Sequence, residues 1–241
     1  TMGNIAGSFI GGFLLIPYVG SAASIAILSL VNLTLGALII RQEEPSDSRE
    51  KPLLAGLSVL TLCLAAGCLW GDPFLSILRK RVERLAKAQK SEYEIYYNRE
   101  GAQGTLTAYR IGKTFYQLWV NGDGMTFPTV DTQIMAHFPL MAVPNPKKML
   151  IICFGMGTTA RSASLYQDLE VTTVEIVDDV YRCFPFYHKD ANEILARKEI
   201  KMVADDGRNF LFLNETKYDV ITIDPAPPIW SSGTVNLYSR E

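Results

Sequence analysis

The sequence predicts an α/β fold: a Rossmann-like, doubly wound parallel sheet preceded by a small antiparallel β unit and N-terminal transmembrane helices. Three observations support this prediction. Residues 1–78 contain long uncharged segments. Short runs rich in Tyr, Thr, Val and Leu follow at 93–120. From residue 144 onward, predicted strands alternate with predicted helices. Such alternation is typical of a mostly parallel sheet with helices on both faces.

Residues 1–78 are expected to be part of a membrane domain. Segments 21–40 and 52–70 carry no charge, and each is long enough to cross a bilayer core of roughly 30 Å. Segment 5–19 is apolar but shorter, and we interpret it as the remainder of a helix that begins before the first residue. A signal peptide is the alternative, and the absence of a basic region and of a cleavage site disfavours it.

Three glycines follow one another at four-residue spacing in the first apolar segment: Gly3, Gly7 and Gly11. In lipid this pattern forms a surface that lets another helix approach closely. The partner helix is either in the same subunit or in a second copy, so a homo-oligomer stays an open alternative.

Basic residues follow the last apolar segment, within a juxtamembrane linker at 79–92. They are Arg79, Lys80, Arg81, Arg84, Lys87 and Lys90. The loop 41–51 mixes three basic with four acidic residues, so the positive-inside rule predicts that the soluble part is cytoplasmic and the protein integral to the inner or plasma membrane. We interpret the basic stretch as a flank on anionic lipid rather than a nucleic-acid site.

The cysteines and histidines indicate neither a disulfide framework nor a metal site. Cys63, Cys68, Cys153 and Cys183 form no CxxC motif, and the chain holds only two histidines. We therefore expect reduced cysteines and no metal.

A small β unit and one helix are predicted for residues 93–143. The strands are expected at 93–97, 104–110 and 114–120, with glycine-rich turns between them. A helix at 129–143 follows, and its apolar residues recur on one face: Val130, Ile134, Phe138 and Met141.

The strongest signal for a ligand lies at 147–175. An apolar run at 149–154, suited to a strand buried on both faces, leads into the turn Gly155-Met156-Gly157, where backbone can approach a ligand. A helix at 160–167 and a second strand at 171–176 follow. Glu175 lies twenty positions after Gly155, and at this spacing a carboxylate can bind both hydroxyls of a ribose.

The remaining elements complete a nucleoside-binding domain at 144–241. We expect a helix at 178–187, a strand at 200–203, a helix at 207–213 and a strand at 218–223. Only four strands of the sheet are present, so we expect the domain to be truncated at its C-terminus.

Carboxylates follow the strands at the edge where ligands bind in such sheets. They are Glu175, Asp205, Asp206 and Asp224. Acidic residues at these places also cap the next helix. We favour capping for Asp178 and Asp205 and ligand binding for Glu175, Asp206 and Asp224, while Asp205 stays in the candidate cofactor-binding set beside its neighbour.

From about Gly104 to the end, the chain resembles the spermidine synthase (polyamine aminopropyltransferase) family. The resemblance rests on the motifs Asn145-Pro146-Lys147-Lys148, the glycine turn, Val174-Glu175-Ile176, Asp206-Gly207-Arg208-Asn209-Phe210, Tyr218-Asp219-Val220-Ile221 and Leu237-Tyr238-Ser239. It implies a methyltransferase-type Rossmann-like sheet, and the apolar segments resemble the membrane-fused members of this family.

The resemblance also implies roles for individual residues. Gly155 and Gly157 would cradle a sulfonium nucleoside, Glu175 would hold its ribose and Asp206 its adenine amino group. Asp224 would deprotonate or orient the attacking amine. The co-substrate implied is decarboxylated S-adenosylmethionine or S-adenosylmethionine, and no metal is implied.

The chain departs from the family pattern where the acceptor and the donor's amino end would bind. Met156 replaces an acidic residue, Pro227 replaces a second aspartate, and Asp131-Thr132 replaces a Tyr-Gln pair. Asp131 would compensate in part for the acidic side chains that are missing. Trp230 and Tyr238 complete the candidate substrate-binding residues. The proline-rich segment 225–230 is either a stiff lid over the acceptor pocket or a surface loop.

The resulting prediction is a transferase that moves an aminopropyl group from decarboxylated S-adenosylmethionine to a small amine or polyamine. One alternative is a methyltransferase for S-adenosylmethionine, whose carboxylate Arg161 would contact. Another is a catalytically silent nucleoside or polyamine sensor coupled to a transporter-like membrane part.

Overall fold

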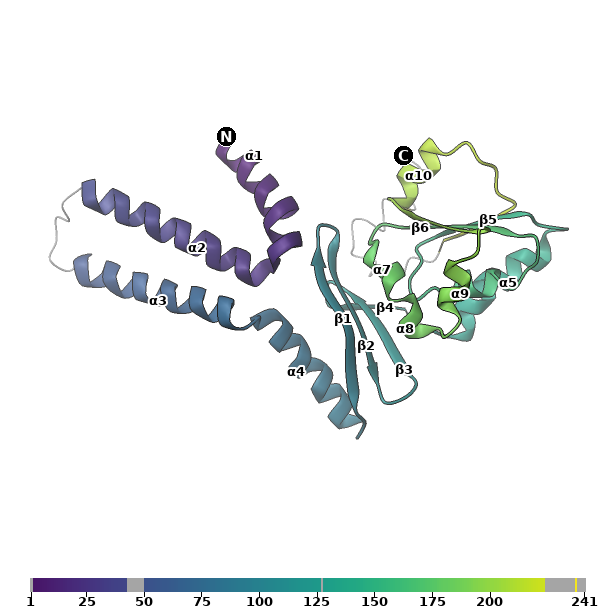
Figure 1. Ribbon diagram of the computed structural model, residues 1–241, viewed down its shortest axis with the longest axis horizontal. Coiled ribbons are helices and arrows are strands. Elements are labelled where there is room, and N and C mark those ends of the chain that lie inside the picture. The colour runs from purple at the N-terminus through teal and green to yellow at the C-terminus, as the bar shows by residue number, and fades with distance from the viewer. Residues whose placement is uncertain (1, 43–49, 127, 224–236, 238–241) are drawn as a thin grey trace. The chain divides into compact units, whose positions relative to one another are not determined.

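The computed structural model describes residues 2–42, 50–126, 128–223 and 237. The chain divides into two compact units, Thr1–Lys90 with Glu100–Ala102, and Ser91–Arg99 with Gln103–Glu241. Figure 1 shows both units as ribbons, and each is described here by itself.

The first unit is helical. Its described elements are α1 (Met2–Phe9), a π-helical turn (Ile10–Leu15), α2 (Ile16–Gln42), α3 (Glu50–Trp70) and α4 (Pro73–Ala88). Helices α2 and α3 run side by side in opposite directions (Figure 1). Pro17 has no amide hydrogen to donate to the preceding turn, and Gly20 adopts φ 83° and ψ 163°, so the helix changes direction there.

One helical stretch, Met2–Ile39, is long and apolar enough to cross a membrane, with a mean hydropathy of 2.1. Leu54–Trp70 and Pro73–Ala88 pass the same test only as a pair, and their axes differ by 58°. A signal sequence and the core helix of a soluble protein also meet this criterion, so the predicted spans stay a proposal. The two predicted segments 5–19 and 21–40 form this one stretch, bent at Gly20.

The second unit begins with an antiparallel sheet, as predicted. Its strands lie in the order β1 (Tyr93–Gly101), β2 (Gly104–Ile111), β3 (Phe115–Val120) and β4 (Asp123–Thr126). Strand β3 pairs antiparallel with both β2 and β4. Asn121 and Gly122 join β3 to β4 with positive φ angles of 55° and 84°, the conformation that a two-residue hairpin requires.

Helix α5 (Val130–Ala142) follows, but the predicted apolar face does not face the core. Val130, Ile134, Phe138 and Met141 are 47–72% exposed, whereas Thr132, Ala136 and Leu140 are buried. The buried side carries the smaller residues, which let the helix approach its neighbours α6 and β8 closely.

Four parallel strands form the second sheet, in the order β7 (Ile200–Ala204), β6 (Glu170–Glu175), β5 (Lys148–Ile152) and β8 (Val220–Ile223). Met149 and Ile151 point into one hydrophobic cluster, and Leu150 and Ile152 into another on the opposite face. The central strand β5 is therefore buried on both faces, which confirms the prediction for its apolar run.

The helices of this unit are short. They are α6 (Thr158–Ala163), α7 (Asp179–Arg182), α8 (Phe184–Tyr187), α9 (Ala191–Leu195) and α10 (Gly207–Leu213). Helix α10 lies on one face of the sheet, and α5, α8 and α9 lie on the other (Figure 1). The predicted helix 178–187 is wrong as one element, because Pro185 stands in the first turn of α8 and separates it from α7. Helix α9 was not predicted.

Candidate functional site

The turn after β5 has an unusual backbone conformation. Cys153, Gly155 and Gly157 have positive φ angles of 71°, 54° and 75°. The Gly157 amide donates to the Phe154 carbonyl over 2.9 Å, and helix α6 starts at the next residue. The chain thus turns sharply from the end of β5 into α6, at the sheet edge where ligands bind in this fold.

Gly157 has a packing role in addition to the predicted ligand role. A Cβ atom here would lie 2.5 Å from the Phe184 ring and 2.6 Å from the Phe154 ring. No side chain fits that space, so glycine is required by the aromatic core under the turn. Any contribution of Gly157 to ligand binding comes from its backbone.

Met156 lies between the two glycines but faces inward. Only 2% of the residue is exposed, and it belongs to the same hydrophobic cluster as Phe154 and Phe184. The residue that replaces the family's acidic side chain is therefore a core residue in this conformation.

Glu175 ends β6 and joins it to the glycine turn. Its Oε2 accepts a hydrogen bond from the Phe154 amide over 2.9 Å, and its Oε1 accepts one from the Val177 amide over 3.1 Å. Burial raises the pKa of Glu175 above its usual value, and the bonds from these amides oppose that shift. The structure thus places a half-buried carboxylate at the carboxyl end of a central strand, and its binding of a ribose stays a proposal.

Of the two aspartates after β7, Asp206 and not Asp205 caps the next helix. Asp206 is the N-cap of α10, and its Oδ1 accepts from the amides of Arg208 and Asn209 over 2.8 and 3.2 Å. Asp205 accepts instead from the Asp206 amide over 2.7 Å, so the predicted capping by Asp205 is wrong. Whether Asp206 also binds adenine stays a proposal.

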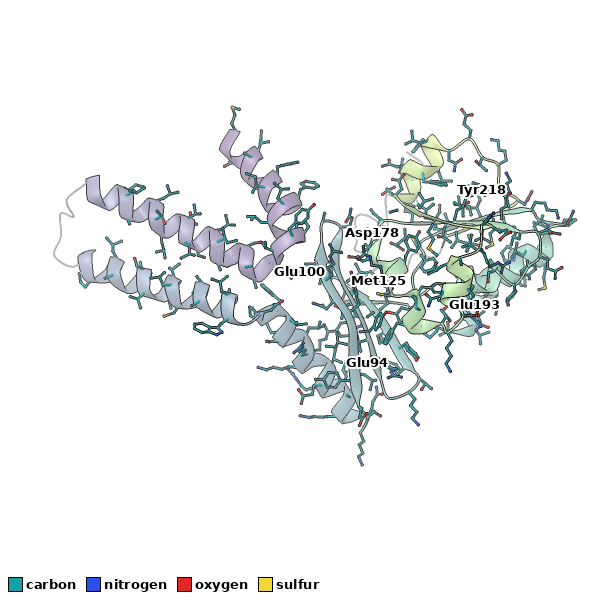
Figure 2. All side chains as sticks on the ribbon, in the orientation of Figure 1. Glu94, Glu100, Met125, Asp178, Glu193 and Tyr218 are labelled. Atoms are coloured by element: carbon teal, nitrogen blue, oxygen red, sulfur yellow. The ribbon has the colours of Figure 1, made fainter. Side chains whose placement is uncertain are left out.

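Asp178 was also predicted to be a cap. It precedes α7 and is exposed (Figure 2), but its own backbone is helical and its side chain makes no capping hydrogen bond. A capping residue ordinarily has an extended backbone, which lets its oxygen reach back to the free amides. The capping prediction for Asp178 is therefore wrong.

Of the substrate-binding candidates, only Asp131 lies in the described residues. It is exposed in the first turn of α5, where a negative charge interacts favourably with the helix dipole. Asp224, Trp230 and Tyr238 lie outside the described residues. Strand β8 ends at Ile223, which pairs with Ile152 at the end of β5.

Arg161 already binds an acidic side chain of the protein. Its Nε donates to both oxygens of Asp190, each over 2.8 Å. The ion pair lowers the pKa of Asp190 and joins α6 to the start of α9. A donor carboxylate would therefore have to share Arg161 with Asp190, and the contact of Arg161 with a substrate carboxylate stays a proposal.

An ionic cluster around Asp179, four residues after Glu175, was not predicted from the sequence. Asp179 is 7% exposed and accepts hydrogen bonds from Arg99 on β1, over 3.3 Å, and interacts with Arg182 over 3.3 Å. Arg99 and Asp179 are eighty residues apart, so no local pattern could pair them. The contact fixes the β unit against the helix that follows Glu175.

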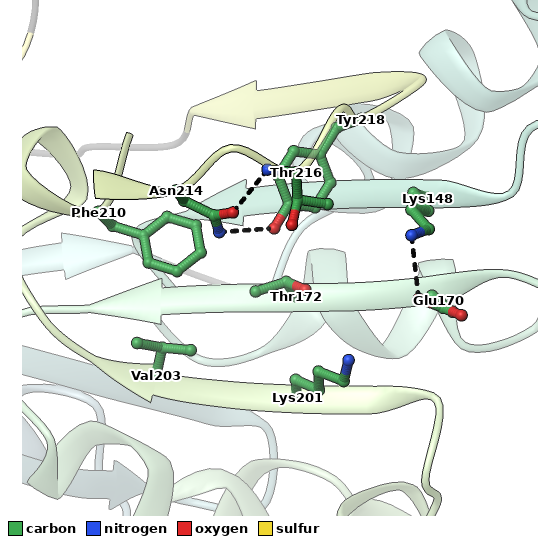
Figure 3. A pocket seen from close by; sticks show the side chains of 9 residues that line it. All are labelled: Lys148, Glu170, Thr172, Lys201, Val203, Phe210, Asn214, Thr216 and Tyr218. Carbon is green, nitrogen blue, oxygen red and sulfur yellow. Dashed lines mark hydrogen bonds and ion pairs between the residues drawn. The ribbon is translucent and has the colours of Figure 1, made fainter. Parts of the chain in front are cut away.

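A small pocket lies elsewhere on the sheet. It has a volume of about 190 Å³ and is lined by side chains from the α10 face, among them Lys148, Glu170 and Lys201 (Figure 3). These three residues stand at or near the amino ends of β5, β6 and β7. The pocket therefore runs along the α10 face of the sheet from the amino ends of the strands, and no residue of the glycine turn lines it, so it is not the predicted nucleoside site.

Within the described residues, no group of three His, Cys, Asp or Glu side chains is placed to hold a metal ion.

Comparisons with known proteins find relatives for the part of the chain that holds the parallel sheet and the glycine turn. The family profile "Spermine/spermidine synthase domain" matches residues 129–241. This part of the chain is therefore similar to spermine/spermidine synthase domains. It includes α5, the whole parallel sheet, the glycine turn and every candidate site residue.

Curated relatives of the spermine/spermidine synthase domain carry out two related reactions. Putrescine N-methyltransferase 2 of Nicotiana attenuata is 32% identical over 104 residues, covering 41% of this chain and 27% of the relative. A polyamine aminopropyltransferase of Caldicellulosiruptor saccharolyticus is 30% identical over 98 residues, covering 40% and 35%. One from Leptospira biflexa is 28% identical over 165 residues, covering 56% and 57%. The chain thus spans about a quarter to little more than half of these relatives' length.

Solved structures show the same fold. The spermidine synthase of Thermotoga maritima matches with a TM-score of 0.50 and 23% identity, covering 56% of this chain and 47% of that one. A spermidine synthase in complex with the transition-state analogue AdoDATO matches equally well. The spermidine synthase-like α/β fold is therefore established for this chain.

Proposed function

We propose that the spermine/spermidine synthase domain binds decarboxylated S-adenosylmethionine and transfers its aminopropyl group to a small amine. The observation that carries this proposal is the carboxylate of Glu175. It is half-buried at the end of β6 and hydrogen-bonded to the amide of Phe154, which precedes the glycine turn. The match to the family profile and the aminopropyltransferase relatives support the choice of reaction.

Each residue of the site has one task in this proposal. Glu175 exchanges its bonds to the turn amides for bonds from the two ribose hydroxyls, and the turn amides then face the nucleoside. Asp206 accepts from the adenine amino group while it caps α10. The bound sulfonium supplies an activated alkyl group, so the protein mainly has to orient the amine and accept one proton. Asp224 accepts that proton.

Turnover by the full-length, detergent-solubilised protein tests the reaction. The donor, labelled in its aminopropyl group, is incubated with putrescine, spermidine and other primary amines. We expect labelled polyamine from at least one acceptor, and a loss of about 100-fold or more in Asp224→Asn with donor binding retained. Donor binding without transfer to any amine would contradict the proposed reaction but not the nucleoside site.

Methyl transfer from S-adenosylmethionine is a second candidate. Putrescine N-methyltransferases are among the relatives, and Met156 removes the acidic group that the family resemblance assigns to the donor's amino end. The pairing of Arg161 with Asp190 weakens the support for this candidate, since Asp190 already offsets the charge of that arginine. Transfer of a labelled methyl group to putrescine, at a rate above that of aminopropyl transfer, would favour it.

We further propose that the helical unit anchors this domain on the cytoplasmic side of a membrane. The length and apolar composition of Met2–Ile39 and the basic residues that follow α3 support this arrangement. Extraction of membranes at alkaline pH tests it. An anchored protein stays in the pellet, and release into the supernatant would contradict the proposal.

A further inference from the structure

Helix α4 has three different faces. Val82 and Ala86 are 0% and 1% exposed and define the buried face. A second face is exposed and combines apolar with basic side chains at helical spacing: Phe74, Ile77, Arg81, Arg84 and Leu85. The third face is polar. Ser76 and Glu83 both lie on it, because they are seven residues, or about two turns, apart.

The exposed mixed face would be unusual on a helix surrounded by water alone. Phe74, Ile77 and Leu85 are 45%, 65% and 40% exposed, and the two arginines stand within one turn of them. Long basic side chains can extend along an apolar surface while the charge stays in a polar layer. Apolar side chains flanked by arginines are characteristic of a helix at the boundary between lipid headgroups and acyl chains.

The charge of α4 specifies the kind of lipid. Within Pro73–Ala88 there are five basic residues and one acidic residue, and the acidic Glu83 pairs with Lys87 over 2.6 Å. Such a helix is attracted to a negatively charged surface. It does not fit the interior of a bilayer, where each uncompensated charge is strongly unfavourable.

The position of α4 in the chain agrees with this placement. Helix α3 has 21 residues, and its uncharged part, 52–70, extends about 28 Å at 1.5 Å per residue, close to the thickness of a bilayer core. Trp70 ends α3 and is 92% exposed, as suits a residue at the interface. Asp72 then caps α4 through the amides of Phe74 and Leu75, and the axis turns by 58°. The chain leaves α3 in a new direction at the depth of the headgroups.

We propose that α4 is a surface-bound helix whose face Phe74, Ile77, Arg81, Arg84 and Leu85 inserts into an anionic lipid leaflet. This interaction is independent of the transferase reaction.

Site-directed spin labelling of the full chain in vesicles tests the proposal. The four native cysteines are replaced, and folding is checked by circular dichroism. A nitroxide is attached in Ile77→Cys on the proposed lipid face, with Ser76→Cys, one residue away on the polar face, as the matched control. Vesicles contain phosphatidylcholine with or without about one third phosphatidylglycerol. Accessibility to oxygen reports lipid contact, and accessibility to a water-soluble nickel chelate reports solvent.

In anionic vesicles we expect the label at 77 to be accessible to oxygen and shielded from the chelate, and the label at 76 to show the reverse. Neutral vesicles or about 1 M salt, where the Debye length is about 3 Å, should return position 77 to water. Arg81→Gln with Arg84→Gln should lower the equilibrium constant for lipid binding about 25-fold, or fivefold per charge, since each charge near such a surface is worth about 1 kcal/mol. Lys80→Gln with Lys87→Gln removes the same charge off this face and should have a smaller effect.

Two results would overturn the proposal. Equal accessibility of positions 77 and 76 to the chelate in anionic vesicles would place the face in water. Shielding of position 77 from both reagents would instead mean that protein covers it. A label in Leu64→Cys on α3 reports membrane insertion separately, so a failure of the span is distinguishable from a failure of α4.

Discussion

The conformation of single residues at the glycine turn is determined as much by the protein core as by a ligand. At Gly157 the positive φ angle and the rings of Phe154 and Phe184 both exclude a side chain. At Cys153, in contrast, a side chain is present despite a φ angle of 71°. Substitutions at these two positions therefore distinguish the effect of core packing from that of backbone strain.

Replacing Gly157 by Ala is expected to destabilise the second unit by about 2 to 4 kcal/mol, because overpacking and left-handed strain add together. Cys153→Gly is the matched control, since it relieves strain at a neighbouring position and should change stability by less than about 1 kcal/mol. Urea unfolding followed by tryptophan fluorescence measures both. Equal effects of the two substitutions would contradict the packing role.

The raised pKa of Glu175 gives the stability a defined pH dependence. A carboxyl group whose pKa is higher in the folded than in the unfolded protein favours folding in its protonated form. Its contribution is therefore complete below the ordinary value of 4.5 and is lost as the pH rises through the raised pKa of the folded protein.

The free energy of unfolding should accordingly fall with rising pH above 4.5 by more in the wild type than in Glu175→Gln, which does not titrate. Urea unfolding between pH 4 and 8 measures the difference between the two curves. Curves that stay parallel would show that burial does not raise the pKa of this carboxyl.

At the scale of elements, helix α5 contains a proline that the structure accommodates by one tertiary hydrogen bond. Pro139 has no amide hydrogen for the Met135 carbonyl four residues earlier. The Thr222 hydroxyl on β8 donates to that carbonyl over 3.0 Å, and Thr222 is 7% exposed. The helix is thus fixed to the edge of the sheet at its weakest point.

Thr222→Val keeps the shape of the side chain but leaves the Met135 carbonyl without this donor, so it should cost about 1 to 3 kcal/mol of stability. Thr222→Ser retains the hydroxyl and is expected to lose less. Hydrogen exchange of the α5 amides, measured by mass spectrometry, should rise in the valine variant alone. Unchanged exchange would mean that α5 is held by its packing and not by this bond.

Elements dominated by one local pattern were predictable. The apolar run of β5 and the twenty-residue spacing between Gly155 and Glu175 gave the central strands, the turn and the main candidate carboxylate. The periodicity in α5 gave a helix but not its orientation, because its buried face, with Ala136 and Leu140, is also mostly apolar. Which of Asp205 and Asp206 caps α10 depends on backbone angles that adjacent identical residues do not reveal.

Contacts between distant parts of the chain could not be predicted. The pairs Arg99 with Asp179 and Arg161 with Asp190 follow from the three-dimensional arrangement alone. The second pair bears on the choice between the two candidate reactions. Asp190 binds the arginine that would contact the carboxylate of S-adenosylmethionine in methyl transfer.

At the scale of the whole molecule, the chain combines two units of different character. The helical unit carries the apolar stretch and the basic helix α4, and the second unit carries the β sheet and the spermine/spermidine synthase domain. The candidate nucleoside site lies entirely in the second unit, so donor binding should not require lipid. The chain departs most from the spermidine synthase pattern at the residues that the sequence resemblance assigns to acceptor binding.

Donor binding is the central claim of this account. It is tested most directly by calorimetric titration of the full-length, detergent-solubilised protein with decarboxylated S-adenosylmethionine and with S-adenosylmethionine, in the wild type and in Glu175→Ala. We predict tighter binding of the decarboxylated nucleoside and at least a tenfold loss of affinity in Glu175→Ala. Lys201→Ala, in the pocket on the α10 face of the sheet, should bind as the wild type does. Binding of neither nucleoside, or equal binding by Glu175→Ala and the wild type, would contradict the account.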